Sequence, residues 1–384
     1  MSLLLPYEEP SGYTTLGLFS GAGGLDLGFE AAGFMHTESS DILDCAVSTL
    51  RHNRPDWHVV QGDVRAYTPG FRKGLDVLLA GFPCQGFSLG GKRDPHDSRN
   101  TLYREVLRVA DLMKPRVIVM ENVLNLRTMV HPETSRPFAD QMVAELAALG
   151  YHTESAFFRV SGYGVPQTRR RFVFVAFRGG PDPWFAFPTP DGDTTSRRFL
   201  EDLVKGEGGH LPNHDPSWDF KSSVHRSTGG TIGPGEPIVP IRISRTASDG
   251  HPVRSYDQPF PAVDTATVWG FAHGKVSAER VVKDRTKELF IRNPDATAKL
   301  WRITAQRMRT FTAREYARLQ TFPDTWAFVG NNKRDVQLQI GNAVPVSFAK
   351  RIALAVRRSL EAQDGNLKAQ RRSRLAKQLP LIMD

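Results

Sequence analysis

One cysteine of the chain is placed where it could act as a nucleophile. Cys84 lies in the glycine-rich segment GFPCQGFS (residues 81–88), which directly follows the apolar run DVLLA (residues 76–80). Structural cysteines outside disulfides prefer buried apolar sites, whereas the N–H groups of a loop lower the pKa of a thiol and make it reactive. Cys45, in an apolar helical pattern, is expected to fill the core instead. Cys84 is therefore the candidate for covalent catalysis.

A carboxylate and a group of arginines lie in segments that could reach the same place. Glu121 comes directly after the apolar run RVIVM (residues 116–120), where it is either a helix cap or an acid held near Cys84. Arg169 and Arg171 precede the apolar run FVFVAF (residues 172–177), and strand alternation puts them on one face. Two guanidinium groups on that face suit a carbonyl oxygen and a phosphate, unless they form a solvated strand edge.

A glycine-rich turn and two acids suggest a second ligand. The turn FSGAGG (residues 19–24) joins an expected strand to an expected helix, so its N–H groups could approach a ligand, although a tight connection is the alternative. Asp41 follows the second expected strand and Asp63 follows the third. The first could accept ribose hydroxyls and the second an exocyclic adenine amine, although each alone could be a cap. The ordered set favours an adenosine-containing cofactor beyond the carboxyl ends of the strands.

The elements that must position these residues alternate over the first half of the chain. Strands are expected at residues 14–19, 34–39, 57–60, 76–80, 116–120 and 172–177, with helices between several of them, including 102–113 and 139–149. This alternation predicts a parallel, doubly wound α/β sheet. From Gly179 to about Arg245 the periodicity is lost and Gly, Pro, Asp, Ser and Thr dominate. Residues 179–300 are therefore expected to form a loop-rich insertion or a separate small domain. Thr312 and Glu315 form a capping-box pattern that starts a further helix, and residues 346–360 are expected to form the last amphipathic helix.

The composition limits the class of protein. The chain has 384 residues, enough for two domains or three, and its 50 Lys and Arg against 41 Asp and Glu give a net charge of +9. Two cysteines cannot form a disulfide framework or a four-cysteine zinc site. The first residues carry no secretory signal, and no run of about 18 apolar residues occurs. A soluble, intracellular protein is expected.

Taken in order, these segments resemble the DNA (cytosine-5)-methyltransferases, of the bacterial restriction–modification type. The matching pieces are LFSGAGGLDLGF, Asp41, GDV (62–64), GFPCQGFS, ENV (121–123), QTRRR (167–171), RTFTAREYARLQTFPDTW and QIGNAVPV. They cover most of residues 14–177 and 305–360, and their ordered combination is highly specific. Gly86 departs from the pattern, because proline is common there, which concerns the rigidity of the loop and not the nucleophile.

The resemblance implies a fold, a cofactor and partners. The fold is a Rossmann-like, doubly wound α/β sheet of S-adenosylmethionine-dependent methyltransferases over residues 1–185, completed by 335–384, with a smaller, loop-rich target-recognition domain over 186–334. The cofactor is S-adenosylmethionine, with S-adenosylhomocysteine as product, and the substrate is cytosine in double-stranded DNA. A monomer of the bacterial cytoplasm is expected, associated with the nucleoid and not with a membrane. It is expected to protect host DNA in a restriction–modification system, alongside a separately acting endonuclease.

The resemblance also assigns residues to three roles, and it implies no metal. The catalytic residues would be Cys84, Glu121, Arg169 and Arg171. The cofactor would be bound by Phe19, Gly21, Gly23, Leu25, Asp41, Ile42, Asp63, Val64, Asn342 and Val344. DNA would be contacted by Gln85, Ser88, Arg242, Arg245, Arg254, Trp269 and Lys275.

The chemistry that the resemblance implies needs a flipped base. Adding the Cys84 thiolate to C6 of cytosine makes C5 nucleophilic, while Glu121 holds or delivers the proton at N3 and Arg171 binds O2. The window 280–314 contains ten basic residues against three acids and is expected to face DNA, unless it is an ordinary exposed charged face. Two alternatives stay open, the same fold acting on RNA, as one tRNA-methylating relative does, and a DNA-binding module without catalysis.

Overall fold

The chain folds into two compact units. In the computed structural model, the described residues are 3, 5–70, 74–83, 97–204, 210–216, 225–227, 238–243, 253–265, 267–283, 290–291 and 300–378. The large unit comprises Pro6–Phe158, Arg170–Pro190 and Val344–Asp384, and the small unit comprises Met1–Leu5, Arg159–Arg169 and Asp191–Ala343. Four residues with predicted roles lie outside the described residues: Cys84, Gln85, Ser88 and Arg245.

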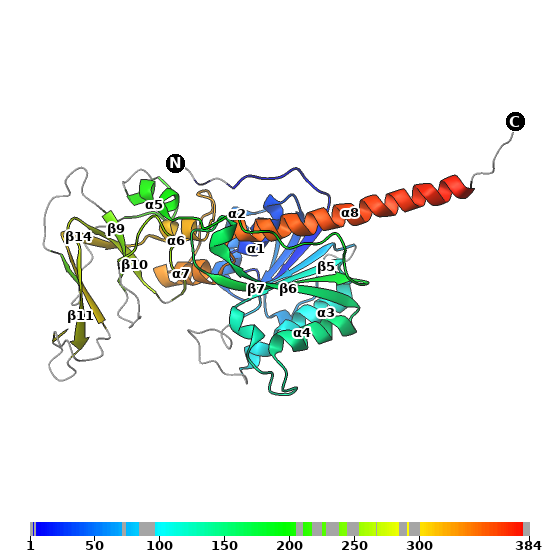
Figure 1. Cartoon of the computed structure of the whole chain (residues 1–384), viewed down its shortest axis with the longest axis horizontal. Helices are drawn as coiled ribbons and strands as arrows, with labels where there is room; N and C mark the ends of the chain where they lie inside the picture. The colour runs from blue at the N-terminus through cyan, green and yellow to red at the C-terminus, as the bar shows by residue number, and fades with distance from the viewer. Residues whose placement is uncertain are drawn as a thin grey trace. The chain divides into compact units, whose positions relative to one another are not determined.

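The large unit is built on a seven-stranded sheet with the strand order β3-β2-β1-β4-β5-β7-β6 (Figure 1). Strands β1 to β5 run parallel, as predicted, and the doubly wound α/β class is confirmed. The predicted direction of the last strand was wrong. β7 runs antiparallel to β5, which makes the sheet mixed. The strands are β1 (Thr14–Leu18), β2 (Met35–Asp41), β3 (His58–Gln61), β4 (Val77–Ala80), β5 (Val117–Asn122), β6 (Tyr151–Arg159) and β7 (Arg170–Arg178).

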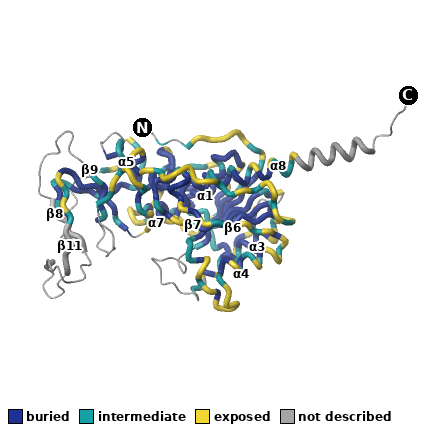
Figure 2. The backbone as a smooth tube through the Cα atoms, viewed as in Figure 1, coloured by how far each residue is buried: buried dark blue, intermediate teal, exposed yellow. Residues whose placement is uncertain are grey.

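Helices cover both faces of this sheet. Figure 1 shows α3 and α4 together on one face and α1 and α8 on the other. The helices are α1 (Gly24–Ala31), α2 (Asp44–Asn53), α3 (Tyr103–Met113), α4 (Phe138–Ala148) and α8 (Val346–Gln378), with short 3-10 turns η1 (Val64–Ala66), η2 (Ser98–Thr101) and η3 (Leu124–Arg127). Because both faces are covered, every residue of β4 and β5 is buried, and the sheet region beside β7 and β6 is mostly dark blue in Figure 2. No helix in the described part of the chain is long and apolar enough to cross a membrane.

The small unit contains more regular structure than its composition predicted. Its two sheets have the orders β14-β10-β9 and β12-β11-β13-β8. The strands are β8 (His225–Ser227), β9 (Ile238–Arg242), β10 (Trp269–His273), β11 (Ser277–Lys283), β12 (Phe290–Ile291), β13 (Leu300–Ala305) and β14 (Arg307–Thr310). The helices are α5 (Arg197–Val204), α6 (Ala313–Leu319) and α7 (Lys333–Asn342), with the 3-10 turn η4 (Val160–Tyr163). The division into a catalytic and a target-recognition domain stays a prediction, since it is a statement about function.

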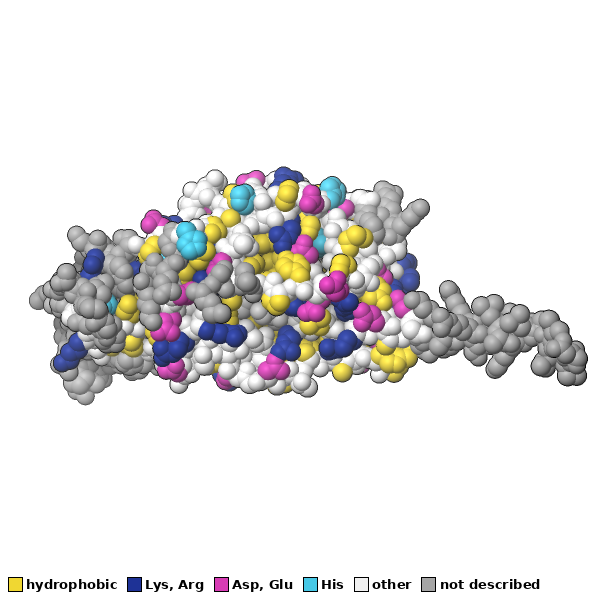
Figure 3. Space-filling model, turned by 90° about the horizontal axis from the view of Figure 1, so that it is seen from above, with side chains coloured by type: hydrophobic (Ala, Val, Ile, Leu, Met, Phe, Trp, Pro, Cys, Tyr) yellow, Lys and Arg dark blue, Asp and Glu magenta, His cyan; other side chains and the backbone are white. Residues whose placement is uncertain are grey.

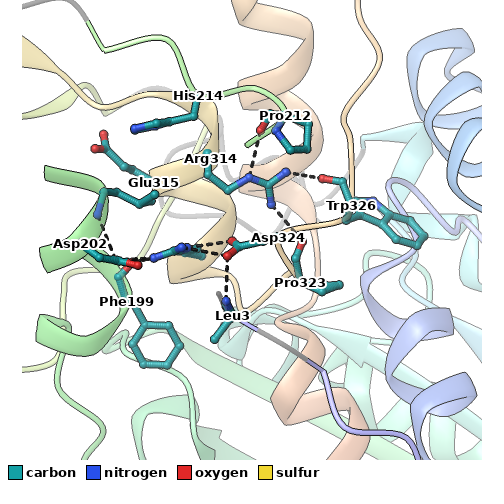
Figure 4. Close-up of polar contacts among 12 residues, drawn as sticks. Leu3, Phe199, Asp202, Pro212, His214, Arg314, Glu315, Pro323, Asp324 and Trp326 are labelled. Carbon is teal, nitrogen blue, oxygen red and sulfur yellow. Dashed lines mark hydrogen bonds and ion pairs between the residues drawn. The ribbon is translucent and has the colours of Figure 1, made fainter. Parts of the chain in front are cut away.

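Buried arginines hold the elements of the small unit together. The capping box predicted at Thr312 and Glu315 is present at the start of α6. Arg314 of α6 donates to the carbonyl oxygens of Pro212, Pro323 and Trp326, as Figure 4 shows. Arg318 donates to both oxygens of Asp324 at 2.8 Å and to Asp202 at 2.6 Å. The charged face of α6 is thus internal, because every guanidinium group there has acceptors from neighbouring loops.

We expect Asp324→Asn to destabilise the small unit strongly. The Asp324 carboxylate is buried and pairs with Arg318 through two hydrogen bonds, so the substitution leaves a buried cation with one carboxylate fewer. Breaking such a pair costs about 3–5 kcal/mol. Urea unfolding followed by tryptophan fluorescence measures this loss in the free energy of unfolding.

Asp257→Asn is the matched control, because Asp257 pairs with Arg197 while its side chain is 69% exposed. An exposed pair contributes about 0–1 kcal/mol. Equal unfolding midpoints for the two variants would contradict the structural role of the Arg318–Asp324 pair.

Candidate active site

The ends of β5 and β7 place the predicted catalytic acid beside an arginine. The strands β4, β5 and β7 are neighbours in the sheet, and Glu121 of β5 lies opposite Val173 of β7. The Glu121 carboxylate forms an ion pair with the Arg171 guanidinium. Glu121 is only 8% exposed, so the pair is largely shielded from water. Such a pair fixes both side chains and keeps an acid and a cation together at the carboxyl end of β5.

Asn122 connects this pair to the segment that contains Cys84. Its side-chain amide donates to the carbonyl oxygen of Phe82 at 3.2 Å, and its carbonyl oxygen accepts from the N–H of Val123 at 2.8 Å. Phe82 is buried and stands two residues before Cys84. The start of the GFPCQGFS segment is thereby fixed beside the end of β5. The sequence interpretation did not single out Asn122, and the only signal for it was its place next to Glu121.

The two arginines that were predicted together belong to different units. Arg171 lies in the large unit, whereas Arg169 belongs to the small unit and is buried there. Arg169 donates to the carbonyl oxygens of Val263 at 2.7 Å and Gly341 at 3.0 Å. Nearby, the amide of Gln167 donates to the carbonyl oxygen of Leu319 at 2.5 Å. These bonds hold Gln167 and Arg169 within the small unit, and direct catalysis by Arg169 stays a prediction.

The glycine-rich turn is fixed by the first predicted acid. Asp41, at the end of β2, accepts from the N–H of Gly21 at 2.7 Å and from the N–H of Leu43 at 2.8 Å. Burial raises the pKa of Asp41, although these N–H groups act in the opposite direction. Within the turn, Phe19 has a φ of 56°, a left-handed conformation that is strained for a residue with a side chain. Strain of this kind concentrates at ligand-binding turns, so the turn fits a binding role.

An apolar side chain stands next to this carboxylate. Ile42 is 62% exposed, which is unusual for isoleucine and leaves its side chain available to a flat apolar ligand. The carboxylate of Asp41 suits two neighbouring hydroxyl groups, and Ile42 suits the face of a purine. The residues at the end of β2 therefore fit an adenosine-containing ligand.

Leu25, Asp63 and Val64 have other contacts in the structure. The Asp63 carboxylate accepts from the backbone N–H and the guanidinium of Arg65, and these bonds lower the pKa of Asp63 to about 2. Val64 is buried in the core of the large unit, and Leu25 is buried in α1. Contact of these three residues with the cofactor stays a prediction. If Asp63 contacts the cofactor, its carboxylate must bind the cofactor and Arg65 at the same time.

The last predicted motif also reaches the turn. A Cβ atom on Gly24, the first residue of α1, would collide with the carbonyl oxygen of Val344. Val344 is therefore packed directly against the turn within the large unit. Asn342 ends α7 in the small unit, and its role in cofactor binding stays a prediction.

Three of the predicted DNA-contacting residues form one cluster in the small unit. Arg242 of β9 and Trp269 of β10 are register partners, and their guanidinium carbon and indole ring are 5.9 Å apart. The guanidinium carbon of Arg254 lies 5.7 Å from the same ring. Burial and the neighbouring charge of Arg242 lower the pKa of Arg254. Trp269 is 2% exposed, so we correct its role from base reader to support beneath the two arginines. Lys275 is exposed in the turn after β10.

The predicted basic strip is corrected at two positions. Arg309 and Arg314 are completely buried, and Arg309 pairs with Glu315 inside the small unit. Neither side chain is on a surface that DNA could contact. Figure 3 shows Lys and Arg intermingled with Asp and Glu over the described part of the face that it presents, so that part carries charges of both signs.

Comparisons with known proteins agree with this arrangement. The family model of C-5 cytosine-specific DNA methylases matches residues 13–358. The Type II methyltransferase M.Eco47II of Escherichia coli is 32% identical over 348 residues, which cover 90% of this chain and 78% of that protein. M.NgoMIV of Neisseria gonorrhoeae, another Type II methyltransferase, is 29% identical over 367 residues, which cover 92% and 99%. The structure of Spodoptera frugiperda DNMT2 has the same fold, with a TM-score of 0.55 at 16% identity over 90% of this chain and 99% of that one. The chain therefore belongs to the C-5 cytosine-specific DNA methylase family and is a DNA cytosine-5 methyltransferase.

Proposed function

We propose that this enzyme methylates one cytosine of a specific duplex DNA sequence through a covalent adduct between Cys84 and C6, with S-adenosylmethionine as the methyl donor. The observation that supports this most directly is the pairing of Glu121 with Arg171, beside the bond from Asn122 to Phe82. This arrangement brings the acid, the cation and the start of the nucleophile's segment to the ends of adjacent strands. Each of the three is needed by the same reaction.

The cofactor site that we propose lies at the ends of β1 and β2. Asp41 holds the ribose hydroxyl groups, and Ile42 covers one face of the adenine. The turn from Phe19 to Gly23 presents its N–H groups to the rest of the ligand, and Val344 closes the turn from behind. When bound, S-adenosylmethionine supplies an electrophilic methyl group.

The protein residues move electrons and protons in a defined order. The Cys84 thiolate adds to C6 of the flipped cytosine, which forms an S–C bond and shifts electron density to C5 and N3. Glu121 holds a proton at N3, and Arg171 donates to O2 as that oxygen gains negative charge. After C5 has accepted the methyl group, water takes the C5 proton, and the electrons of that C–H bond form the C5–C6 double bond and expel the sulfur of Cys84 as a thiolate. The aromatic ring is thereby restored and the nucleophile regenerated.

We propose that Arg242 and Arg254 contact the DNA from the small unit. Trp269 supports both guanidinium groups, which limits their motion and so lowers the entropy lost when they bind. Arg242 and Arg254 are both only partly buried, so their guanidinium groups can still reach an acceptor outside the small unit. The acceptor that suits a guanidinium group is a base edge or a phosphate oxygen of the DNA.

Arg254→Ala is expected to reduce discrimination between the recognition site and a single-mismatch duplex by about 10- to 100-fold, since one guanidinium–base contact is worth about 1–3 kcal/mol. Fluorescence anisotropy with both duplexes at fixed salt measures this ratio. Arg197→Ala is the control, because Arg197 also lies over an aromatic ring but is paired with Asp257. An equal loss of affinity for both duplexes would instead mean that Arg254 contacts the phosphate backbone.

Bisulfite sequencing of DNA from cells that express the protein tests the proposed function. The expected result is one short sequence whose cytosine is protected at every occurrence, with no protection in cells that lack the protein. Random protection or none would contradict sequence-specific methylation. Competition between duplex DNA and tRNA for methyl transfer from labelled cofactor tests the RNA alternative, and we expect only the DNA to be labelled.

We further propose that the methylation protects host DNA from a restriction endonuclease that acts separately, as in the systems to which the Type II relatives are assigned by name. DNA from expressing cells would then resist an endonuclease that cuts the mapped site. We propose that the enzyme acts on DNA in the bacterial cytoplasm. We also propose that it acts as a monomer, and sedimentation of the purified protein checks this oligomeric state.

A further inference from the structure

A buried carboxylate that no motif assigned lies under the glycine-rich turn. Asp26 is in the first turn of α1 and is 1% exposed. A Cβ atom on Gly17, in strand β1, would collide with Oδ1 of Asp26 and would lie 2.6 Å from Oγ of Ser20. The Asp26 carboxyl group therefore fills the space that a side chain of residue 17 would need. It sits between β1 and α1, directly beneath the turn that we assign to the cofactor.

The strongest charges that act on Asp26 are negative. Its Oδ2 has no hydrogen-bond partner within the described part of the chain. The charged groups with the largest effect on it are two other carboxylates, Asp41 at the end of β2 and Glu30 on α1. Burial, together with these charges, raises the pKa of Asp26 to about 7, although hydrogen bonds from Ser20 and from its own backbone N–H act in the opposite direction. A buried, incompletely bonded carboxylate costs free energy, and a nearby positive ligand would remove that cost.

We propose that Asp26 is a specificity-determining residue of the cofactor site, whose carboxylate favours binding of the positively charged sulfonium cofactor over its neutral thioether product. The inference rests on the proposed function, because the turn must bind the cofactor for a sulfonium to lie near Asp26. A unit charge several ångströms away in a partly buried site changes affinity by about ten-fold. Transfer of the methyl group removes the charge, so the same carboxylate also assists release of the product.

The test is isothermal titration of the purified full chain with three ligands. S-adenosylmethionine is cationic at sulfur, sinefungin carries an amine in its place, and S-adenosylhomocysteine has a neutral sulfur. For Asp26→Asn, which keeps the size of the side chain, we expect affinity for the two cationic ligands to fall about ten-fold. Affinity for S-adenosylhomocysteine should change by less than about two-fold. An equal change for all three ligands, or no change, would overturn the inference.

Control variants separate the charge effect from damage to the fold. Glu105→Gln removes the same charge from α3, at a carboxylate that is paired with Arg108 and is not one of the groups that act on Asp26, and all three affinities should stay the same. The double variant Gly17→Asp with Asp26→Ala moves a carboxylate into the vacated space and should restore the preference for cationic ligands. If Asp26→Asn proves unstable, this double variant tests the inference in its place. Thermal unfolding checks that the double variant is folded. Failure of the double variant to restore the preference, while folded, would count against it.

The pH dependence of the unsubstituted protein gives an independent readout. Asp26 ionises as the pH rises through about 7, so the preference for S-adenosylmethionine over S-adenosylhomocysteine should increase from pH 6 to pH 8. The preference should not change with pH in Asp26→Asn, even though Asp41 and Glu30 remain. Should the unsubstituted protein bind none of the three ligands, the proposed function itself fails. If it binds them with a pH-independent preference, only the role of Asp26 fails.

Discussion

Replacing Cys84 with serine is expected to reduce methyl transfer to DNA on the order of 10⁴-fold or more. A serine hydroxyl is almost entirely protonated near neutral pH and is a far weaker nucleophile than a thiolate, so the addition at C6 stops. Without that addition, C5 of cytosine is too electron-poor to accept the methyl group. Transfer of a labelled methyl group to the mapped duplex in a single turnover measures the loss.

The control for this substitution is Cys45→Ser, at the second cysteine of the chain. Cys45 lies in α2 and has no role in the proposed chemistry, so its variant should transfer methyl groups at the normal rate. Both variants should bind DNA and S-adenosylhomocysteine as the unsubstituted protein does. A Cys84→Ser protein with activity within ten-fold of normal would eliminate covalent catalysis by this residue.

Glu121→Gln is expected to lower the single-turnover rate by about 10²–10⁴-fold, the range for loss of a general acid or base. The amide cannot hold a transferable proton at N3. It also leaves the guanidinium of Arg171 without its carboxylate partner, so the donor to O2 loses its fixed position. Because both effects act as charge develops in the ring, the rate of the chemical step should fall far more than the affinity for DNA.

Glu154→Gln is a suitable comparison, since Glu154 is an exposed carboxylate of β6 that pairs with His152. Its rate should be unchanged. The assignment of Glu121 would fail if Glu121→Gln retained a rate within three-fold of normal. It would also fail if the loss appeared entirely as weaker DNA binding.

The parallel half of the sheet could be predicted because its strands are buried on both faces. β4 and β5 are short, continuous apolar runs, and β5 ends in Glu121 and Asn122, which mark the carboxyl edge. β6 was missed because it is an edge strand whose first half, His152 to Ser155, is polar. The direction of β7 could not be predicted, since an apolar pattern is the same for a strand that runs either way.

In the small unit, the two sheets were not predicted because their strands are short and contain residues that are unusual in strands. β9 contains Pro240, which argues against a strand in a sequence-based interpretation, and β12 is two residues long. α5 is amphipathic but isolated between segments rich in glycine and proline, so its periodicity did not stand out. Elements of this kind are fixed by their tertiary partners more than by local preference.

Motif order predicted which residues matter, but not how they contact one another. Pairing of Glu121 with Arg171 depends on the register between β5 and β7, which are about fifty residues apart in sequence. Asp26 can be buried because Gly17 has no side chain to occupy the same space. Helical periodicity does not predict this packing between a strand and a helix. Likewise, Arg309 and Arg314 appeared to belong to a basic surface, because composition does not distinguish an exposed arginine from one bound to internal acceptors.

The most direct test of covalent catalysis uses a duplex with 5-fluorocytosine at the mapped target position. Fluorine replaces the C5 proton whose loss normally expels the cysteine, so the adduct should persist once the methyl group has been transferred. We expect a denaturation-resistant complex in the presence of S-adenosylmethionine, and digestion followed by mass spectrometry should locate the modified base on Cys84. A folded, cofactor-loaded enzyme that methylates the ordinary duplex but forms no adduct, or forms one at another residue, would contradict the mechanism.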